Sequence, residues 1–397
     1  MASSNTLVTP TAIAKEALMM LENSMVMGNL VHRQYKPEFN KIGTSVTIRK
    51  PNKFAVTESA TRSNTNMAEA STTLTVSTQA HVSWAFSSVE LTMTIEQYSE
   101  RYIKPAAMAL ANSIDAKLTG LYDDVNDLVG TAGVDPSTFK TLADAQQRLD
   151  ENAAPNMPRH AVLNPAANWG LADGLKGTFA PKPASDIFTK GYLGTVAGLD
   201  IHMDQNIKAH TTGAFTTSAT PVVKTGSSAG DTSIATDGWN SNSSTMKAGD
   251  VFTVGAVNAV NPVSGDDLGF LKQMVNLNDE TSASGDMTID LGFALYASGA
   301  YKTVSALPLA EAAITPVGTE STAYAQNLVF HPNAFALVVM PLAMPAGVWG
   351  ARETYNNVSI RVVKDYDISA DEEIIRLDVL YGVKTLYPEL ACRIIGS

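Results

Sequence analysis

One stretch of the sequence matches the motif that holds the nucleophile of many hydrolases. Gly226-Ser227-Ser228-Ala229-Gly230 has the G-x-S-x-G spacing in which a serine attacks a carbonyl carbon. That chemistry requires a strand before the motif and a helix after it, which hold the serine on a sharp turn. The residues that follow, 231–234, are instead of β-type. The sequence therefore favours a flexible loop over a catalytic site.

The histidines do not form a recognisable metal-binding motif. They are His32, His81, His160, His202, His210 and His331, and no pair has the H-E-x-x-H spacing of a helical zinc site. His202, Asp204 and His210 could in principle bind a metal, but their spacing fixes no ligand geometry. Ordinary polar residues of a surface strand and loop are the favoured interpretation.

Two further patterns do not amount to a binding site. Asn276, Asn278 and Glu280 weakly resemble calcium ligands, yet they lack the loop pattern with its central glycine, and acidic turn residues explain them better. No group of glycines has the spacing of a phosphate-binding loop. We therefore predict no catalytic residue, no cofactor and no metal site, and a protein that is not an enzyme.

The composition limits the partners that the chain can bind. Its 397 residues are 45% hydrophobic, which is enough for two or three domains with cores of their own. The net charge of −11 makes the chain a poor general binder of nucleic acid, since affinity for phosphates comes mainly from Lys and Arg. Arg49, Lys50 and Lys53 form a small basic cluster that we interpret as a solvated strand end or a subunit contact. An acidic wall could still enclose DNA without adhering to it.

The sequence also predicts the cellular compartment in which the protein folds. Cys392 is the single cysteine, so no disulfide can form within the chain, and folding in the cytoplasm fits this best. The first residues contain neither a basic segment nor an apolar core, and so do not resemble a secretory signal. The longest apolar run, near residues 334–344, is too short to cross a bilayer and is interrupted by Pro341. We expect a soluble protein without a membrane partner.

Two segments have strong helical periodicity. Thr9-Pro10 would begin the first helix, in which apolar residues recur at helical spacing: Ile13, Ala14, Ala17, Leu18, Leu21 and Met25. This stripe must dock either on the rest of the chain or on a neighbouring subunit. The second helix is predicted over residues 104–129 from a longer series: Leu110, Ile114, Leu118, Leu121, Val125 and Leu128. Its length would be about 39 Å at 1.5 Å per residue, enough for a structural spine.

Much of the remaining sequence is of strand type. Residues 36–90 contain two alternating segments joined by a polar stretch, which predicts a long hairpin. Residues 213–312 contain short β runs separated by Gly, Ser, Asn and Asp, and we interpret them as a compact all-β module inserted between two mixed portions. Strands are also predicted within residues 327–339, 358–363 and 373–385, the last with Ile375, Leu377, Val379, Tyr381 and Val383 on one face.

Three segments of the C-terminal half resemble a known family. Residues 324–337, with the sequence YAQNLVFHPNAFAL, are similar to a segment of coat proteins from P-twenty-two-type phages that leads out of an inserted β-barrel. Residues 247–253, KAGDVFT, resemble the start of that barrel, and residues 381–389, YGVKTLYPE, resemble the closing strand of the family. The close matches cover about a quarter of the chain, and their order and spacing support the resemblance.

The resemblance implies an α+β fold of the Hong Kong 97 capsid type with an inserted all-β, barrel-like domain. The implied parts are an N-arm (1–35), an E-loop with flanking strands (36–90), a P-domain with the spine helix (91–154), a first part of the A-domain (155–212), the insertion domain (213–312), and a second part of the A-domain with returning P-domain strands (313–397). Some capsids of this fold carry a Lys–Asn cross-link, but nothing in the sequence identifies such a pair.

The function that the resemblance implies is that of a major capsid protein in a virion. The subunit would assemble with itself as hexamers and pentamers in the host bacterial cytoplasm, with a scaffolding protein and a portal protein as partners, and would enclose double-stranded DNA without sequence-specific binding. The residues that we expect at subunit interfaces are Ile13, Leu18, Phe54, Glu58 and Arg62. The alternatives are an encapsulin-like nanocompartment shell of the same fold and, less favoured, a secreted β-rich hydrolase or adhesin.

Overall fold

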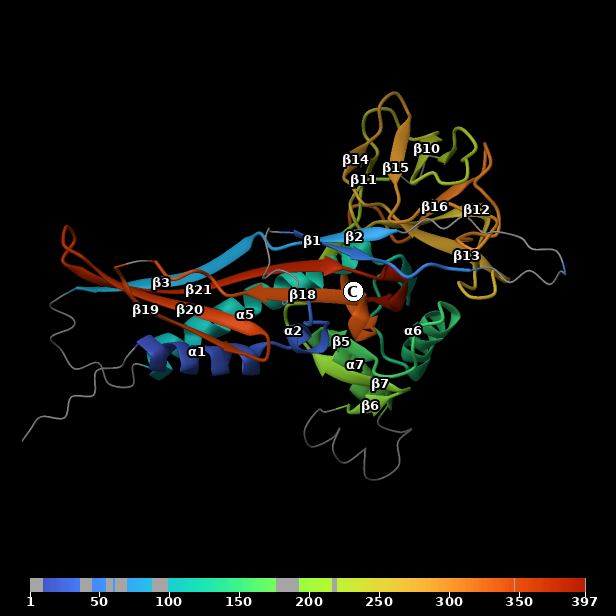
Figure 1. Cartoon of the computed structure of the whole chain (residues 1–397). Coiled ribbons are helices and arrows are strands. Elements are labelled where there is room, and N and C mark those ends of the chain that lie inside the picture. Colours follow the sequence, from blue (N-terminus) through green and yellow to red (C-terminus); the bar gives the residue numbers. More distant parts are fainter. Residues whose placement is uncertain are drawn as a thin grey trace, which may run out of the picture. The chain divides into compact units, whose positions relative to one another are not determined.

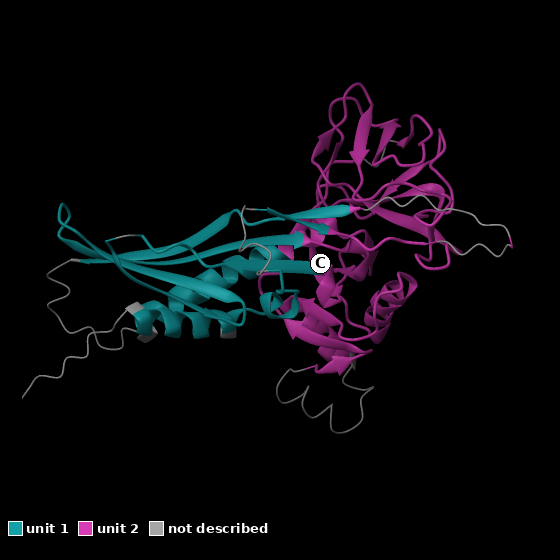
Figure 2. Cartoon of the chain, in the orientation of Figure 1, with its two compact units in different colours: residues 1–48, 71–118, 335–384 teal, residues 49–70, 119–334, 385–397 magenta. Residues whose placement is uncertain are grey.

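The chain folds as two units, each assembled from segments that are distant in sequence. A computed structural model describes residues 10–35, 45–54, 60, 70–87, 99–175, 193–215, 220–345 and 347–396. Unit 1 combines residues 1–48, 71–118 and 335–384, and unit 2 combines residues 49–70, 119–334 and 385–397 (Figure 2). The predicted domain boundaries remain predictions. Residues 213–312 belong to unit 2, which also contains the segments before and after them, residues 119–212 and 313–334.

Unit 1 consists of a long antiparallel sheet and the helices that cover it (Figure 1). In chain order its described elements are α1 (Pro10–Ser24), α2 (Met27–Leu30), β1 (Ser45–Arg49), β2 (Ser71–Thr75), β3 (Thr78–Ser87), the π-helical turn η1 (Ser99–Ile103), α5 (Lys104–Thr119), β18 (Phe335–Met340), β19 (Trp349–Tyr355), β20 (Val358–Asp367) and β21 (Glu372–Thr385). The main sheet has the order β18–β21–β20–β19, with β3 also paired to β21, while β1 and β2 pair with each other. The hairpin strands and the 373–385 strand predicted from alternation are confirmed.

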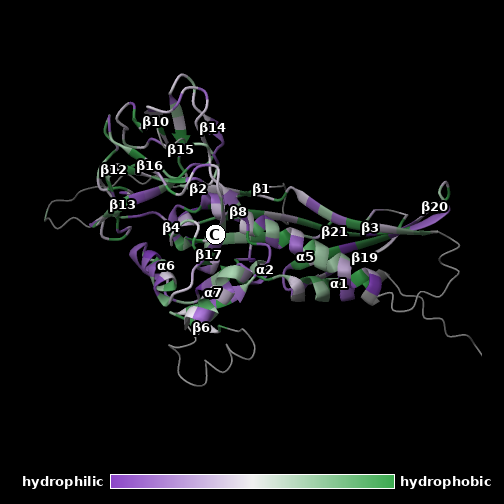
Figure 3. Cartoon of the chain, turned by 180° about the vertical axis from the view of Figure 1, so that it is seen from behind, coloured by the Kyte–Doolittle hydropathy of each residue, from purple (hydrophilic) through white to green (hydrophobic). Residues whose placement is uncertain are grey.

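The first helix docks on the sheet of its own unit. Helix α1 lies against β19 and β20, and every residue of its predicted apolar stripe is buried. The apolar residues Ile360 and Val362 of β20 are completely buried, and Ile375 and Leu377 on the predicted face of β21 are almost inaccessible. In Figure 3 hydrophobic and hydrophilic residues alternate around α1, as expected for a helix with one buried face. The open question of what this stripe packs against is therefore resolved in favour of the chain itself.

The predicted spine helix is shorter than its apolar pattern indicates. Helix α5 ends at Thr119, so it has 16 residues, and a 3₁₀ turn, η2 (Gly120–Asp124), follows. At 1.5 Å per residue its length is about 24 Å. Leu128 lies instead on strand β4 (Asp127–Val129), which pairs in parallel with β22 (Ala391–Ile395). The Gln273 side chain also bonds both the amide and the carbonyl of Leu128, at 2.7 and 2.9 Å. These tertiary hydrogen bonds outweigh the local helical preference of residues 125–129.

Unit 2 contains a mixed sheet and a group of smaller sheets. Its described elements, besides η2, β4 and β22, are α6 (Phe139–Glu151), β5 (His160–Leu163), α7 (Pro165–Leu175), β6 (Thr195–Val196), β7 (Leu199–Met203), β8 (Ala209–Thr211), β9 (Val222–Val223), β10 (Ser233–Asp237), β11 (Thr245–Met246), β12 (Val251–Val260), β13 (Asp267–Val275), β14 (Glu280–Thr281), β15 (Met287–Asp290), β16 (Ile314–Pro316), β17 (Ala323–Phe330), and the 3₁₀ turns η3 (Pro332–Ala334) and η4 (Pro388–Leu390).

The mixed sheet has the order β4–β22–β17–β5–β7–β6, with β8 also paired to β17. Its core includes apolar residues of α6 and α7, among them Leu142, Leu149 and Leu171. Helix α7 begins after Asn164, because the Asn164 side chain accepts the amide of Ala167 at 2.9 Å and so caps the helix. The strand character predicted within residues 327–339 is confirmed in two strands, β17 and β18, which η3 at Pro332 separates; the chain passes into unit 1 after Ala334.

The region of short β runs has a hydrophobic core of its own. Its described strands form three small sheets, β15–β10–β9, β11–β14 and β13–β12–β16. Fifteen buried residues between Phe215 and Ile314 make up one apolar cluster that includes Trp239 and Phe252. The Trp239 indole donates to the Thr236 hydroxyl at 2.7 Å, so its polar group is satisfied inside that core. We call residues 213–316 the β-module.

A buried carboxylate ties three strands of unit 1 together. Asp378 on β21 is completely buried and accepts hydrogen bonds from Arg361 on β20 at 2.7 Å, from Arg376 at 2.7 Å and from Gln79 on β3 at 3.1 Å. Desolvation on burial raises the pKa of Asp378, but the hydrogen bonds from Arg361, Arg376 and Gln79 outweigh it, and the pKa is lowered overall. The ionised form of Asp378 therefore stabilises the sheet.

We predict that Asp378→Asn lowers the free energy of unfolding at pH 7 by on the order of 3 kcal/mol, because it breaks a charged pair whose carboxylate is completely buried and leaves Arg361 and Arg376 without their charged partner. A lowered pKa gives stability that is present above the ordinary value of 3.8 and is lost as the pH falls below it. The difference between wild type and variant in urea unfolding should therefore shrink between pH 5 and pH 3. The exposed Asp365→Asn on β20 is the matched control, and a pH-independent difference would contradict this role.

The placement of α5 gives a second prediction. Ile114 is completely buried on this helix, and Ile114→Pro removes a backbone hydrogen bond and inserts a ring into the preceding turn, at a cost of about 3 kcal/mol or more. The variant should lose soluble subunit, as measured by the supernatant fraction and by circular dichroism. Lys117→Ala, an exposed change on the same helix, should leave both unchanged.

Candidate functional site

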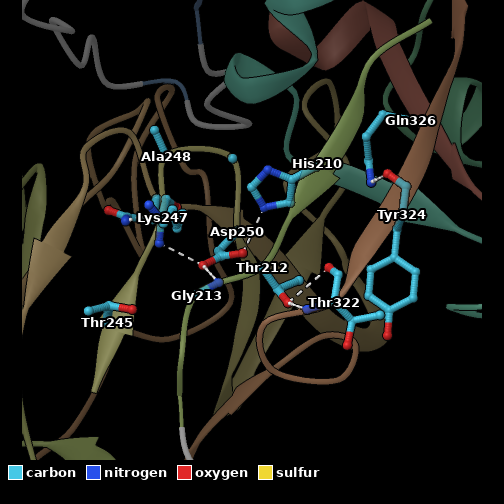
Figure 4. Close-up of polar contacts among 12 residues, drawn as sticks. His210, Thr212, Gly213, Thr245, Lys247, Ala248, Asp250, Thr322, Tyr324 and Gln326 are labelled. Atoms are coloured by element: carbon cyan, nitrogen blue, oxygen red, sulfur yellow. Dashed lines mark hydrogen bonds and ion pairs between the residues drawn. The ribbon is translucent and has the colours of Figure 1, made fainter. Parts of the chain in front are cut away.

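The chain enters and leaves the β-module through two adjacent strands. Strand β8 leads into the module and β17 leads out of it, and the two pair antiparallel, with Tyr324 opposite His210. Just beyond this pair, the Thr212 hydroxyl donates to the Thr319 carbonyl at 2.6 Å and accepts the Thr322 amide at 3.1 Å (Figure 4). The two crossings are thus held together by backbone and side-chain hydrogen bonds. We call this region the junction.

Asp250, in the turn before β12, is the centre of the junction. Its Oδ1 accepts the Nε2–H of His210 at 2.7 Å, and its Oδ2 accepts the backbone amides of Gly213 at 3.0 Å and Lys247 at 2.7 Å (Figure 4). Because Nε2 of His210 donates, its Nδ1 can accept the hydroxyl of Tyr122, 3.0 Å away. Asp250 is 2% exposed, so these charge-assisted bonds form away from water and connect the turn before β12 to β8 and η2.

A second buried charge lies beside this chain of hydrogen bonds. Arg393 on β22 is completely buried and donates through Nη1 to the Gly249 carbonyl at 2.8 Å, with its guanidinium 5.8 Å from the ring of Tyr122. Burial lowers the pKa of Arg393 to about 10, which leaves it charged at neutral pH. Burial, followed by the charge of Asp123, raises the pKa of Tyr122 to about 12, so its hydroxyl stays a donor. Desolvation and then the charge of Asp124 raise the pKa of Asp123 to about 6.

Two glycines allow the backbone to approach this network. Gly249 has φ +97°, and an added Cβ would lie 3.1 Å from the Tyr122 ring and 3.3 Å from the His210 ring. A Cβ on Gly213 would lie 2.1 Å from the Thr245 carbonyl oxygen. Any other residue at Gly249 would therefore strain the backbone or displace one of these rings, and any other residue at Gly213 would displace the backbone at Thr245.

The junction has the parts of a proton relay but none of the access that catalysis needs. A Tyr–His–Asp chain can orient an imidazole, yet His210 and Asp250 are 6% and 2% exposed, so a substrate could not reach them. No group of three or more potential metal ligands occurs among the described residues. The arrangement is suited to holding the β-module in place.

The candidate chemical residues of the sequence are not brought together. Residues 226–230 form a loop between β9 and β10 rather than a strand–helix elbow. His202 lies beside His160, with ring centroids 5.7 Å apart, whereas His210 belongs to the junction. Asp204 accepts the amide of Asn206. Within the described part of the chain, no helix is long and apolar enough to span a membrane.

The residues predicted at subunit interfaces have different environments. Ile13 and Leu18 are 2% and 4% exposed within unit 1, so their burial in the chain itself gives no support to an interface role. Phe54 is 71% exposed and remains a candidate. Glu58 and Arg62 lie outside the described residues.

The sequence interpretation missed the junction. Its four side chains come from separate segments of the chain: Tyr122, His210, Asp250 and Arg393. The sequence pattern suggests only one role for His210, that of a possible metal ligand. One signal was present in the sequence, the pair Gly249-Asp250 directly before an apolar strand. In the structure Gly249 has a positive φ and Asp250 is buried, so the pair marks a turn whose backbone lies close to other side chains.

Comparison with known proteins identifies the fold and the family. A family model described as "P22 coat protein - gene protein 5" matches residues 1–396. No curated protein matches the chain. Similar solved structures include that titled "Mycobacterium phage Che8", with TM-score 0.51, 16% identity, and coverage of 93% of this chain and 90% of that chain. Another is the capsid structure of the cyanophage P-SCSP1u, with TM-score 0.46, 12% identity, and coverage of 94% and 88%.

The family match shows a phage coat protein, and the mixed helix and sheet architecture agrees with an α+β fold of the Hong Kong 97 type. The family match extends over all but the last residue of the chain. The chain belongs to the P22 coat protein family, and is a major capsid protein: a structural component of a virion that assembles with copies of itself into a shell.

The junction yields a prediction about stability. Asp250→Asn keeps the shape of the side chain but removes its charge, and hydrogen bonds to charged groups contribute about 1.5–3 kcal/mol each. The variant should lower the free energy of unfolding of the subunit by at least that amount in urea titrations. Asp266→Asn, an exposed change in the same module, should alter it by no more than about 0.5 kcal/mol. Equal unfolding midpoints for the two variants would contradict the role of Asp250.

Proposed function

We propose that copies of this chain assemble as hexamers and pentamers into an icosahedral head that encloses double-stranded phage DNA, with a scaffolding protein and a portal protein as partners. Assembly takes place in the cytoplasm of the host bacterium, and the role is purely structural. The observation that carries the proposal is the family match along the whole chain. The net charge of −11 supports it, since an acidic wall holds DNA without binding it tightly.

The parts of the subunit take the roles expected for this fold. The hairpin of β1 and β2 is the base of the E-loop, and it is closed by the bond from the Lys50 amide to the Ala70 carbonyl at 2.8 Å. Phe54 extends beyond that bond with most of its surface exposed. Burial of such a side chain against a neighbouring subunit would contribute about 1.5–3 kcal/mol, and the contribution recurs at every equivalent contact of a shell.

The β-module is an insertion domain within the A-domain of the subunit. Its separate hydrophobic core supports this assignment, as do the adjacent entry and exit strands. An inserted domain must leave its host sheet intact, and β8 and β17 achieve this because they pair with each other at the point of insertion. The module stabilises the subunit through the junction, where Asp250 and Arg393 are both buried.

The E-loop role is tested by two changes of different severity. Replacement of residues 58–69 by a short Gly-Ser linker preserves Lys50 and Ala70, and should leave a folded subunit that does not form shells. Phe54→Ser should weaken each contact by about 10- to 100-fold. Both are measured by electron microscopy and sedimentation after co-expression with the scaffolding protein, and unfolding curves establish that the subunits are folded.

Leu309→Ser is the matched control, because Leu309 is an equally exposed apolar residue in the β-module, at 71%. It should form shells like the wild type. Normal particles from the linker variant would refute the E-loop assignment, whereas a failure of the wild type itself to form shells would refute the proposed coat function.

A further inference from the structure

Three histidines lie close together on one face of the mixed sheet in unit 2. His160 is the first residue of β5, His202 lies on the neighbouring strand β7, and His331 directly follows β17, which pairs with β5 on its other side (Figure 1). The ring centroids of His160 and His202 are 5.7 Å apart, and the ring of Phe330 is 6.3 Å from that of His160. The next residue of β5, Ala161, belongs to the core formed with α6 and α7, so His160 points to the opposite face of the sheet.

The hydrogen bonds of this histidine group suit uncharged imidazoles. Nδ1 of His331 accepts the backbone amide of Asn333, in the turn η3, at 3.2 Å. A protonated imidazole has no acceptor, so protonation of His331 removes this bond. Nδ1 of His160 is buried and has no hydrogen-bond partner among the described residues. Since His331 is buried and His160 is largely buried, a charge on either ring would be held away from water.

The carboxylate beside this group offers little compensation for an added proton. Asp200 on β7 lies opposite His160, but its Oδ2 is 3.9 Å from Nδ1 of that ring, beyond hydrogen-bonding distance, while its Oδ1 accepts the hydroxyl of Thr195 at 2.7 Å. Burial lowers the pKa of His160, His202 lowers it further, and Asp200 offsets only part of these effects. Burial also lowers the pKa of His202, again against a smaller effect of Asp200.

The charges near His331 also oppose its protonation. Burial lowers the pKa of His331, and the positive charge of the buried Arg159 lowers it further. Asp150 forms an ion pair with Arg159 at 2.7 Å, so this carboxylate serves the guanidinium rather than an imidazole. Glu389 lies in η4, the turn that contacts η3, and there it adds to the effect of burial in raising the pKa of Tyr387. The acids around the histidine group thus act mainly on other side chains.

We propose that His160, His202 and His331 form a pH-sensitive switch in the coat subunit, which loosens strand β7 and the turn η3 when the rings take up protons. At neutral pH the uncharged rings pack together. On acidification their charges repel one another, and the amide of Asn333 loses its acceptor. Strand β7 should respond first, since among the described strands its far edge is held only by β6, which has two residues. All three rings belong to one chain, so the switch does not depend on how copies assemble.

The sign of the effect follows from the lowered pKa values. An unfolded imidazole has the ordinary pKa of 6.5, so between that pH and the lower native values the unfolded chain binds more protons. The free energy of unfolding therefore falls as the pH drops below 6.5. At pH 5.5 an unfolded imidazole is protonated about ten times more often than not, so each histidine raises the unfolding equilibrium constant by up to about 10-fold.

Two other groups titrate in the same range. Burial lowers the pKa of His32, which adds to the loss of stability, whereas the pKa of Asp123 is raised to about 6, which opposes it. Both groups are the same in the wild type and in variants of the histidine group. The difference between two proteins in their response to pH therefore isolates the three histidines.

Urea unfolding of the full-length free subunit at pH 7.5 and pH 5.5 tests the switch. The triple variant His160→Gln, His202→Gln and His331→Gln keeps polar side chains that do not titrate. Between the two pH values, the unfolding constant of the wild type should rise at least 10-fold more than that of the variant. His81→Gln, an exposed change on β3, is the matched control and should respond like the wild type. An equal response of the wild type and the triple variant would overturn the proposal.

Measurements on the wild-type subunit decide the proposal if the triple variant does not fold. The Cε1–H signals of the three rings should titrate with midpoints below 6.5 in the folded subunit and near 6.5 in urea. After correction for intrinsic rates, the amides of Asn333 and of residues 199–203 should exchange at least 10-fold faster at pH 5.5 than at pH 7.5, and those of residues 391–395 much less. Ordinary midpoints in the folded subunit, or titration without faster exchange at β7 and η3, would refute the switch.

Discussion

The hydrogen-bonded pairing of β8 with β17 is the constraint on which unit 2 depends. It holds together the two points at which the chain crosses between the mixed sheet and the β-module. Asp250 extends this constraint into the module, because one carboxylate binds the imidazole of β8 and two amides of the turns around it. Strand β17 also pairs with β22 and β5, so it joins this point of crossing to the rest of the mixed sheet.

Unit 1 is organised around one strand in the same way. Strand β21 has fourteen residues and pairs with β18, β20 and β3. Its two faces have different functions: the face with Ile375 and Leu377 is apolar and buried, while Asp378 on the other face gathers two arginines and Gln79. Hydrophobic burial and a buried ion cluster thus stabilise opposite sides of a single sheet, and both depend on the register of β21.

The sequence predicted the features whose causes are local. The alternation of β21 and the stripe of α1 are periodic patterns, and each has one face buried as periodicity requires. The end of α5 was not predicted, because the apolar spacing continues through Leu128 while the strand conformation there comes from β22 and Gln273, more than 100 residues away. The junction was not predicted either, since nothing in the spacing of Tyr122, His210, Asp250 and Arg393 indicates that they meet. The coat family was predicted from short matching segments, and the comparison over the whole chain confirmed it.

The adjacent crossings at Thr212 and Thr322 also make the β-module replaceable. Paired strands lie about 5 Å apart, so a polypeptide grafted between β8 and β17 needs ends that are that close, and it must also supply the acceptors that Asp250 and Gly249 offer to His210 and Arg393. The same geometry allows the module to diverge in sequence away from Gly249 and Asp250, while the strands on either side stay in register. A coat built in this way offers one defined position at which a foreign domain can be carried by every subunit.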